Sequence, residues 1–177
     1  MPTIMTHAII PAAIAVAVLR PCLSWPVIAV GMILAMLPDA DVIGFKFGVQ
    51  YGDAWGHRGA SHSIFFAAIV AAVLVLIARP KYWIATFFFW FIAMASHGIL
   101  DMFTDGGLGA AIAWPFSEIR FFAPYQPVAV SPIGISNFVS MRGVQVLISE
   151  FIWIVLPISL LAIAIRRFFY REAGALP

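Results

Sequence analysis

The sequence predicts an all-α integral membrane protein, built as a polytopic bundle of about five membrane helices. Three observations lead to this fold class. The 177 residues are 63% hydrophobic and only 10% charged, whereas about a quarter of the residues in a soluble domain are charged. The mean hydropathy is +1.02. Five apolar stretches follow one another, and the length fits a single domain over residues 1–177.

The five apolar stretches differ in length. The last two are long enough to cross a hydrocarbon core, which takes about 20 helical residues. The third is slightly short. The first two are shorter still, so they are expected to form either two short spans or a re-entrant hairpin buried in protein. In chain order the stretches cover residues 4–19, 25–37, 63–78, 82–103 and 144–165.

Two longer connections, residues 38–60 and 104–142, separate the apolar stretches. Both are rich in glycine or proline, which argues against regular helix. The second also carries aromatic side chains, which prefer the interface between membrane and water. We therefore expect it to lie on the lipid surface. Its aromatic residues include Trp114, Phe116, Phe121, Phe122 and Tyr125.

The charges predict how the helices are oriented. If the helices alternate in direction, both long connections and the start of the first helix lie on one side, here called the motif side. The opposite side carries six of the ten Lys/Arg residues but one of the eight acids. Short cytoplasmic connections collect Lys/Arg, so we predict that the motif side is periplasmic or extracellular. The six basic residues are Arg20, Arg79, Lys81, Arg166, Arg167 and Arg171.

Some classes of function are disfavoured by composition. The net charge is +2 and the basic residues are scattered, whereas a nucleic-acid interface needs them clustered. The single cysteine, Cys22, rules out an internal disulfide and argues against a cysteine-based metal site. A cleavable signal peptide is not expected, because the first basic residue, Arg20, follows the first apolar stretch.

All the histidines and aspartates fall on the motif side. Ionisable groups are costly at membrane depth and usually mark a functional site. The set consists of His7, His57, His62 and His97 with Asp39, Asp41, Asp53, Asp101 and Asp105.

Two local patterns suggest metal ligands. His97 and Asp101 are four residues apart, so on a helix both can reach one ion, or one can orient the other. The alternative is a buried His–Asp hydrogen bond that joins two helices. Asp39 and Asp41 at a helix end repel each other, which a divalent cation relieves. The alternative, a polar turn after a helix, does not explain two acids at the negative end of a helix dipole.

The segment His57–Ser63 is the third pattern. His57 and His62 can converge if the first lies in a loop and the second begins the third helix, with Ser61 as its N-cap. His57 is then a ligand or a general acid/base. Arg58 is a candidate phosphate clamp, because guanidinium matches phosphate oxygens bidentately. The less favoured alternative is an arginine at the interface that contacts a lipid headgroup. His7 carries little weight alone and gains it from its expected position beside the others.

The number of candidate ligands predicts more than one ion. A catalytic zinc usually takes three protein ligands, so seven would serve two or three divalent ions, with zinc expected and manganese the alternative. Clustered divalent ions are suited to phosphoester hydrolysis. The seven candidates are His7, Asp39, Asp41, His57, His62, His97 and Asp101.

These motifs resemble the LexA-regulated, membrane-bound metal-dependent hydrolase family of bacterial inner membranes, the YdjM-like family. The match runs in order through most of the chain, and the His-Arg-Gly-x-x-His-Ser element is its most specific part. Ser61 stands where the family is expected to have threonine, so the hydroxyl is kept. The matching segments are Thr6-His7, Pro38-Asp39-Ala40-Asp41, His57-Arg58-Gly59-Ala60-Ser61-His62-Ser63, His97-Gly98-Ile99-Leu100-Asp101 with Thr104, Trp114-Pro115-Phe116 and Arg142-Gly143.

The family is in turn similar in motif order to zinc-dependent phospholipase C and the P1-type nucleases, which are all-helical and hold a cluster of zinc ions. This more distant similarity implies a phosphoesterase, although a fold-level analogy does not identify the substrate. The resulting hypothesis is a membrane enzyme that hydrolyses a phosphoester, such as a lipid headgroup admitted from the side through residues 104–142.

Three other functions are compatible with parts of the pattern. A transporter would hold its ionisable residues near mid-membrane, between broken helices, whereas here they lie at helix ends. A non-catalytic protein would bind a structural ion with no open coordination position. A serine hydrolase using Ser61 or Ser63 would leave the aspartates unexplained.

Overall fold

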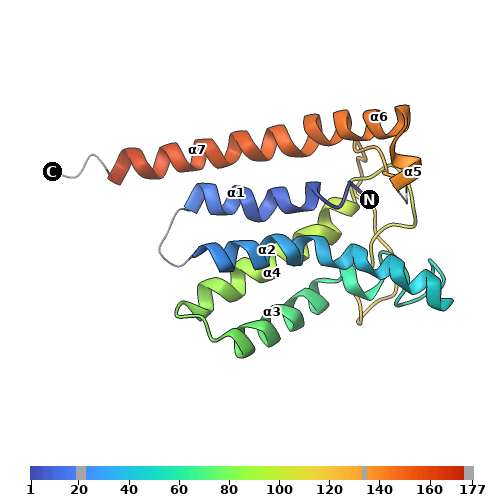
Figure 1. Ribbon diagram of the computed structural model, residues 1–177, viewed down its shortest axis with the longest axis horizontal. Helices are drawn as coiled ribbons and strands as arrows, with labels where there is room; N and C mark the ends of the chain where they lie inside the picture. Colours follow the sequence, from blue (N-terminus) through green and yellow to red (C-terminus); the bar gives the residue numbers. More distant parts are fainter. Residues whose placement is uncertain (19–22, 133–134, 174–177) are drawn as a thin grey trace.

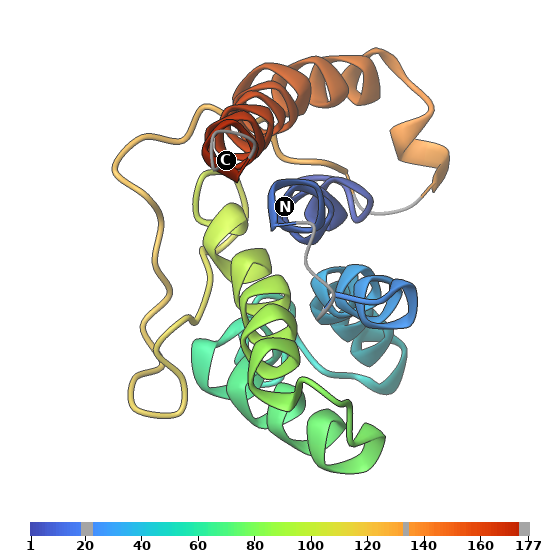
Figure 2. The same cartoon turned by 90° about the vertical axis from the view of Figure 1, so that its left-hand side faces the viewer.

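The computed structural model describes residues 1–18, 23–132 and 135–173, and this part of the chain is helical without any β-strand. The predicted fold class, an all-α membrane bundle, is confirmed. Arg20 and Cys22, which entered the predictions above, lie outside the described residues. The longer helices run side by side (Figure 1). In the end view, α4 lies beside α2 and α3, and α1 lies between α2 and α7 (Figure 2).

The helices follow in this order: η1 (Thr6–Ala8), α1 (Ile9–Val18), α2 (Trp25–Met36), η2 (Leu37–Phe47), η3 (Ala60–His62), α3 (Ile64–Ala78), α4 (Trp83–Asp101), α5 (Ile135–Phe138), α6 (Met141–Glu150), η4 (Phe151–Val155) and α7 (Leu156–Ala173). The first three η segments are 3-10 helices, and η4 is a π-helical turn. This turn lies just before Pro157, where the proline ring disturbs regular α-helical bonding.

Within the described residues, three helical segments are long and apolar enough to cross a membrane, namely Trp25–Phe47, Trp83–Asp101 and Met141–Phe169. Two shorter apolar helices, Thr6–Val18 and Ile64–Ala78, accompany them. Each of the five predicted apolar stretches is therefore helical over most of its described residues, and Leu19 of the first lies outside them. The second is longer than the sequence predicts.

The extra length of the second segment corrects one expectation. Residues 38–60 were expected to lack regular helix, but η2 continues α2 as far as Phe47. Pro38 does not stop the chain from coiling, because it lies in the first turn of the 3-10 helix, where a missing N–H costs nothing. Continued coiling keeps Asp39 buried.

Packing around α4 sets the register of α2. Phe89, Trp90 and Met94 of α4 are nearly fully buried. Gly31 of α2 lies against Phe89 so closely that a Cβ atom would come within 2.5 Å of the ring. The Trp90 indole donates a hydrogen bond of 2.9 Å to the carbonyl of Val27. These contacts bring the carboxyl end of α2 beside the carboxyl end of α4.

The segment 102–132, which follows α4, is irregular, as its glycines and prolines predict, and it covers one end of the bundle (Figure 1). It is pinned by backbone hydrogen bonds such as Ala123 N to Met102 O, at 2.8 Å. Phe116 in this segment is 84% exposed. That these aromatic residues lie at the membrane surface stays a prediction.

The two ends of the bundle carry different segments, as expected for helices that alternate in direction. The N-terminus, η2 and the irregular segment lie at one end, which is the motif side (Figure 1). The α3–α4 connection and the carboxyl end of α7 lie at the opposite end (Figure 1).

Candidate metal site

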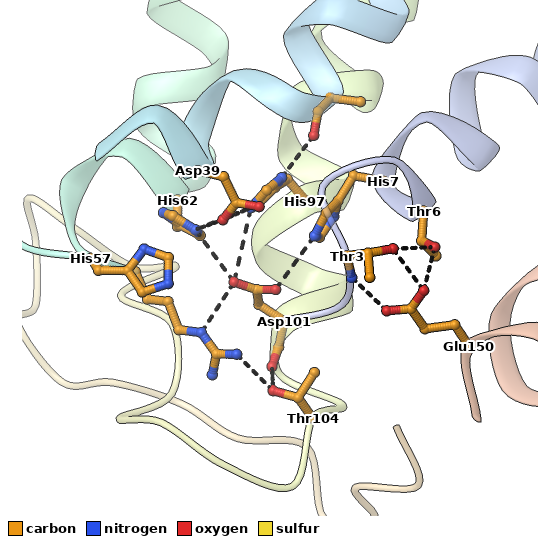
Figure 3. A network of polar contacts seen from close by, with 12 residues as sticks. Thr3, Thr6, His7, Asp39, His57, His62, His97, Asp101, Thr104 and Glu150 are labelled. Atoms are coloured by element: carbon orange, nitrogen blue, oxygen red, sulfur yellow. Dashed lines mark hydrogen bonds and ion pairs between the residues drawn. The ribbon is translucent and has the colours of Figure 1, made fainter. Parts of the chain in front are cut away.

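Four buried side chains from three elements converge on the motif side. Their ligand atoms lie within 4.8 Å of one another, and none of the residues is more than 3% exposed. His97 Nε2 is 3.3 Å from Asp39 Oδ1, and His62 Nε2 is 3.3 Å from Asp101 Oδ2. These side chains are here called the quartet (Figure 3). Its members are Asp39 of η2, His62 of η3, and His97 and Asp101 of α4.

Hydrogen bonds outside the quartet decide which nitrogen of each histidine faces inward. His97 Nδ1 is 2.7 Å from the carbonyl oxygen of Ala35, which can only accept, so Nδ1 carries the proton. The Nε2 atom of His97 then carries the lone pair and faces into the quartet, 3.1 Å from His62 Nε2, where an ion would bind it.

His62 is oriented in the same way by Asp41. Its Nδ1 lies 3.3 Å from Asp41 Oδ2, while Ser61 Oγ donates to the same oxygen at 2.9 Å. Burial alone would lower the pKa of His62, but the carboxylates of Asp101, Asp39 and Asp41 that surround its ring raise it to about 10. The carboxylates around this imidazole therefore favour a positive charge at its position.

The quartet carboxylates have unused hydrogen-bonding capacity. Both oxygens of Asp39 and both of Asp101 are buried and accept no hydrogen bond. A buried carboxylate normally has such partners, because losing water without replacement is costly. Two imidazole nitrogens with two carboxylate oxygens form a donor set that suits zinc. On these grounds the residues present fit a divalent ion.

Arg58 connects the quartet to the irregular segment. Its Nε lies 3.2 Å from Asp101 Oδ2, and its terminal nitrogens donate to Gly106 O at 2.9 Å and Thr104 Oγ1 at 2.8 Å. The side chain is fully buried. Its backbone has φ 63°, a left-handed conformation that non-glycine residues rarely adopt. Arg58 thus sits inside the site, paired with a quartet carboxylate, rather than on the surface.

Asp41 and His57 form a second group next to the quartet. His57 Nδ1 is 2.6 Å from Asp41 Oδ1, and the backbone N–H of Arg58 donates to Asp41 Oδ2 at 3.2 Å. The ligand atoms of Asp41, His57 and His62 also lie within 4.8 Å of one another. His62 is common to both groups, but its Nδ1 faces Asp41 and its Nε2 faces the quartet.

His7 lies on the other side of Asp101. Its Nε2 is 3.6 Å from Asp101 Oδ1, and its ring stacks on His97 with centroids 3.6 Å apart. Neither ring nitrogen of this fully buried residue makes a hydrogen bond. Asp101 therefore presents one oxygen to His7 and the other to His62 (Figure 3).

The prediction that Ser61 caps α3 is wrong, because the cap lies two residues later. Ser63 is the N-cap of α3, and its Oγ accepts from Phe66 N at 3.0 Å. The Ser61 hydroxyl is instead engaged with Asp41. Ser61 therefore helps to orient a candidate ligand.

The seven predicted ligands come together, whereas the other two aspartates stay apart. Asp53 is exposed, and Asp105 is 46% exposed and paired with Arg142. Sequence reasoning also overlooked a buried carboxylate, Glu150, which is 1% exposed. The available signal was an acid inside the fifth apolar stretch, since such residues are rare in membrane helices.

The sequence profile of the YdjM inner membrane protein family matches residues 1–173. The chain belongs to this family. It is 43% identical over 164 residues to the inner membrane protein YbcI of Escherichia coli (strain K12), and the alignment covers 91% of this chain and 95% of the relative. No solved structure matches the chain.

Membership of the YdjM family confirms the resemblance predicted from the motifs. Both names describe inner membrane proteins, and the chain has the apolar helices that this location requires. The more distant similarity to phospholipase C and P1-type nucleases finds no support among solved structures.

Proposed function

We propose that this YdjM-family protein is a membrane-embedded, metal-dependent hydrolase that cleaves a phosphoester, with a lipid-linked phosphate as the expected substrate. The observation that carries the proposal is the quartet, in which the buried ligand atoms lie within 4.8 Å of one another and the carboxylate oxygens accept no hydrogen bond. Divalent ions held there would supply hydroxide near neutral pH and balance the charge on phosphate oxygens.

The residues around the quartet have separate proposed roles. Asp39, His62, His97 and Asp101 hold the first ion. His7 reaches Asp101 from the opposite side, so Asp101 is the carboxylate best placed to be shared with a second ion. Zinc is the expected metal and manganese the alternative. Asp41 orients His62 or joins His57 in binding a further ion.

His57 and Arg58 are the proposed catalytic residues. His57 Nδ1 is bonded to Asp41, so its Nε2 is free to exchange a proton with water or with a leaving oxygen. Arg58 holds Asp101 in place and brings a positive charge beside the ion site. In this arrangement its guanidinium attracts the phosphate group of a bound substrate.

Metal content per chain, measured after purification in detergent, tests the proposal directly. The comparison is with a His97→Ala/Asp101→Ala double variant and with Asp53→Ala, which removes an exposed acid on the same side. We expect at least one zinc or manganese ion in the parent and in Asp53→Ala, and none in the double variant. The absence of bound metal in the parent, even after reconstitution with zinc and manganese, would refute the proposal.

Release of p-nitrophenolate from bis(p-nitrophenyl) phosphate, and of the alcohol or phosphomonoester product from phospholipids, then tests hydrolysis. The parent should be active with bound metal, and the double variant should be inactive. A metal-loaded parent that is inactive on every phosphoester would leave only metal binding.

A structural ion site is the second candidate, favoured by the burial of the quartet at 3% exposure or less. Cobalt-loaded protein separates the two functions. An open coordination position lets added orthophosphate change the visible spectrum of cobalt, whereas a closed structural site leaves the spectrum unchanged.

We also propose that the chain crosses the membrane several times with the quartet at the periplasmic face. The charge bias supports this orientation. Single cysteines at exposed Tyr125 and at Lys81, in a Cys22→Ser background, test it with a membrane-impermeant maleimide. Cells should be labelled at residue 125 and protected at residue 81. The reverse pattern would invert the topology.

A further inference from the structure

A second buried carboxylate lies away from the quartet, at the carboxyl end of α6. Glu150 is 1% exposed, and it shares the buried face of α6 with Gly143 and Val146. It is more than 140 residues distant in sequence from the groups that it binds. A buried carboxylate inside an apolar helix is costly, so its partners indicate what it does.

Glu150 holds the beginning of the chain. It accepts hydrogen bonds from the backbone N–H of Thr3, from Thr3 Oγ1 at 2.7 Å and from Thr6 Oγ1 at 2.6 Å. All three donors are neutral, and both carboxylate oxygens are used. The cluster of Glu150, Thr3 and Thr6 lies beside His7 (Figure 3).

The position of His7 depends on this cluster. Thr6 and His7 are neighbours in η1, so the hydroxyl bonded to Glu150 lies one residue from the candidate ligand. The His7 ring nitrogens make no hydrogen bond that would orient the ring. Stacking on His97 and the path of the η1 backbone must therefore keep His7 Nε2 at 3.6 Å from Asp101.

We propose that Glu150 is a positioning residue, which acts through Thr3 and Thr6 to hold His7 against Asp101 as a metal ligand. The inference rests on the proposed metal site and adds a residue from the third membrane-length segment to it. It couples Met141–Phe169 to a set of candidate ligands that otherwise lies between His7 and Asp101.

A double-mutant cycle between Glu150→Gln and His7→Ala tests the coupling. Glutamine keeps the size of the side chain but turns one acceptor into a donor that faces Thr3 or Thr6. Zinc affinity should fall about 10- to 100-fold in Glu150→Gln, as for other residues that orient ligands. In the His7→Ala background the same change should have almost no effect, within the roughly twofold margin by which independent mutations depart from additivity, because the ligand that Glu150 positions is already missing.

Three further variants separate positioning from general loss of structure. Thr6→Val removes the bonded hydroxyl and should reproduce the loss of affinity, whereas Thr6→Ser should restore it. Ser149→Ala is the matched control. Ser149 is the neighbour of Glu150 in α6, and its Oγ accepts a hydrogen bond from Ala129 N instead of holding Thr3 or Thr6. Equal losses in Ser149→Ala and Glu150→Gln, or additive losses with His7→Ala, would overturn the proposal.

A second measurement does not depend on metal. Diethyl pyrocarbonate modification of His7, followed by peptide mass spectrometry on chelator-treated protein, should be slow in the parent and in Ser149→Ala. It should be fast in Glu150→Gln and Thr6→Val, because η1 is released. If the parent binds no metal, the proposed function fails while this measurement still decides the role of Glu150. Unchanged His7 reactivity in Glu150→Gln would reject the positioning role whatever the metal result.

Discussion

The quartet and the Glu150 cluster are both buried, and both contain carboxylates, but their hydrogen bonding is opposite. The oxygens of Asp39 and Asp101 accept no hydrogen bond, although each lies near histidine nitrogens. Both oxygens of Glu150 accept hydrogen bonds from neutral donors. A carboxylate that has all its partners is part of the scaffold, whereas one without them is prepared for a ligand.

The difference also explains how the two regions can cooperate. The scaffold carboxylate holds a backbone segment, and that segment carries a candidate ligand whose own nitrogens stay free. Rigid support is what a metal site needs, because ligand geometry must be kept while the donors remain unpaired. Three predictions sharpen or break this comparison.

Loss of a quartet carboxylate should have the largest effect. Asp101→Asn keeps the side-chain size and still places an oxygen or amide group beside Arg58, but it removes the negative charge that Arg58, His7 and His62 face. Zinc affinity should fall by more than about 100-fold, beyond the range for residues that only orient ligands. Isothermal titration with a competing chelator measures it, and Asp53→Asn serves as the exposed control. A loss below tenfold would exclude Asp101 from the ligands.

The pH dependence of metal binding should be the next largest effect. The pKa of His62 is raised to about 10 by its carboxylate neighbours, so this imidazole is protonated at neutral pH and must lose the proton to bind an ion. Affinity should therefore rise with pH by about tenfold per unit between pH 6 and 9, with about one proton released per ion. Proton release in weakly buffered solution measures it. A flat profile would mean that His62 is not a ligand.

The smallest expected effect is on stability, and it contrasts the two regions directly. In chelator-treated protein, Glu150→Gln should lower the free energy of unfolding by about 1–3 kcal/mol, because satisfied buried groups lose partners. Asp39→Asn should change it by less than about 1 kcal/mol, since Asp39 accepts no hydrogen bond. Thermal unfolding followed by tryptophan fluorescence in detergent compares the two. Equal destabilisation would remove the distinction between scaffold and ligand carboxylates.

Much of the fold could be read from hydropathy, and the errors have local causes. Helical stretches were predicted in all five places because apolar runs of this length have few other stable forms in a membrane. The continuation of α2 through η2 was missed because Pro38 looks like a stop signal, yet it lies in the first turn of a new 3-10 helix. The N-cap of α3 was predicted at Ser61 and lies at Ser63, because both serines precede the same helix and both can accept from its first N–H groups.

The candidate site could be anticipated only as a set of residues. His97 and Asp101 follow from helical spacing alone, and the structure places them on one face, with Nε2 and Oδ2 3.9 Å apart. The pairing of Asp41 with His57, and of Arg58 with Asp101, could not be predicted. Those contacts join segments whose relative position depends on how α2, α3 and α4 pack.

The sequence by itself determined that the chain is a helical membrane protein and that its histidines and aspartates gather at one end, because hydropathy and alternation of direction are properties of the chain order. Only the tertiary structure decided which of those side chains converge, which nitrogen of His62 and His97 faces inward, and that Glu150 reaches back to Thr3 and Thr6. The physical reason is that hydrogen bonds between segments act over about 3 Å. Which groups become hydrogen-bond partners depends on how side chains pack between helices, and no local pattern in the sequence encodes that packing.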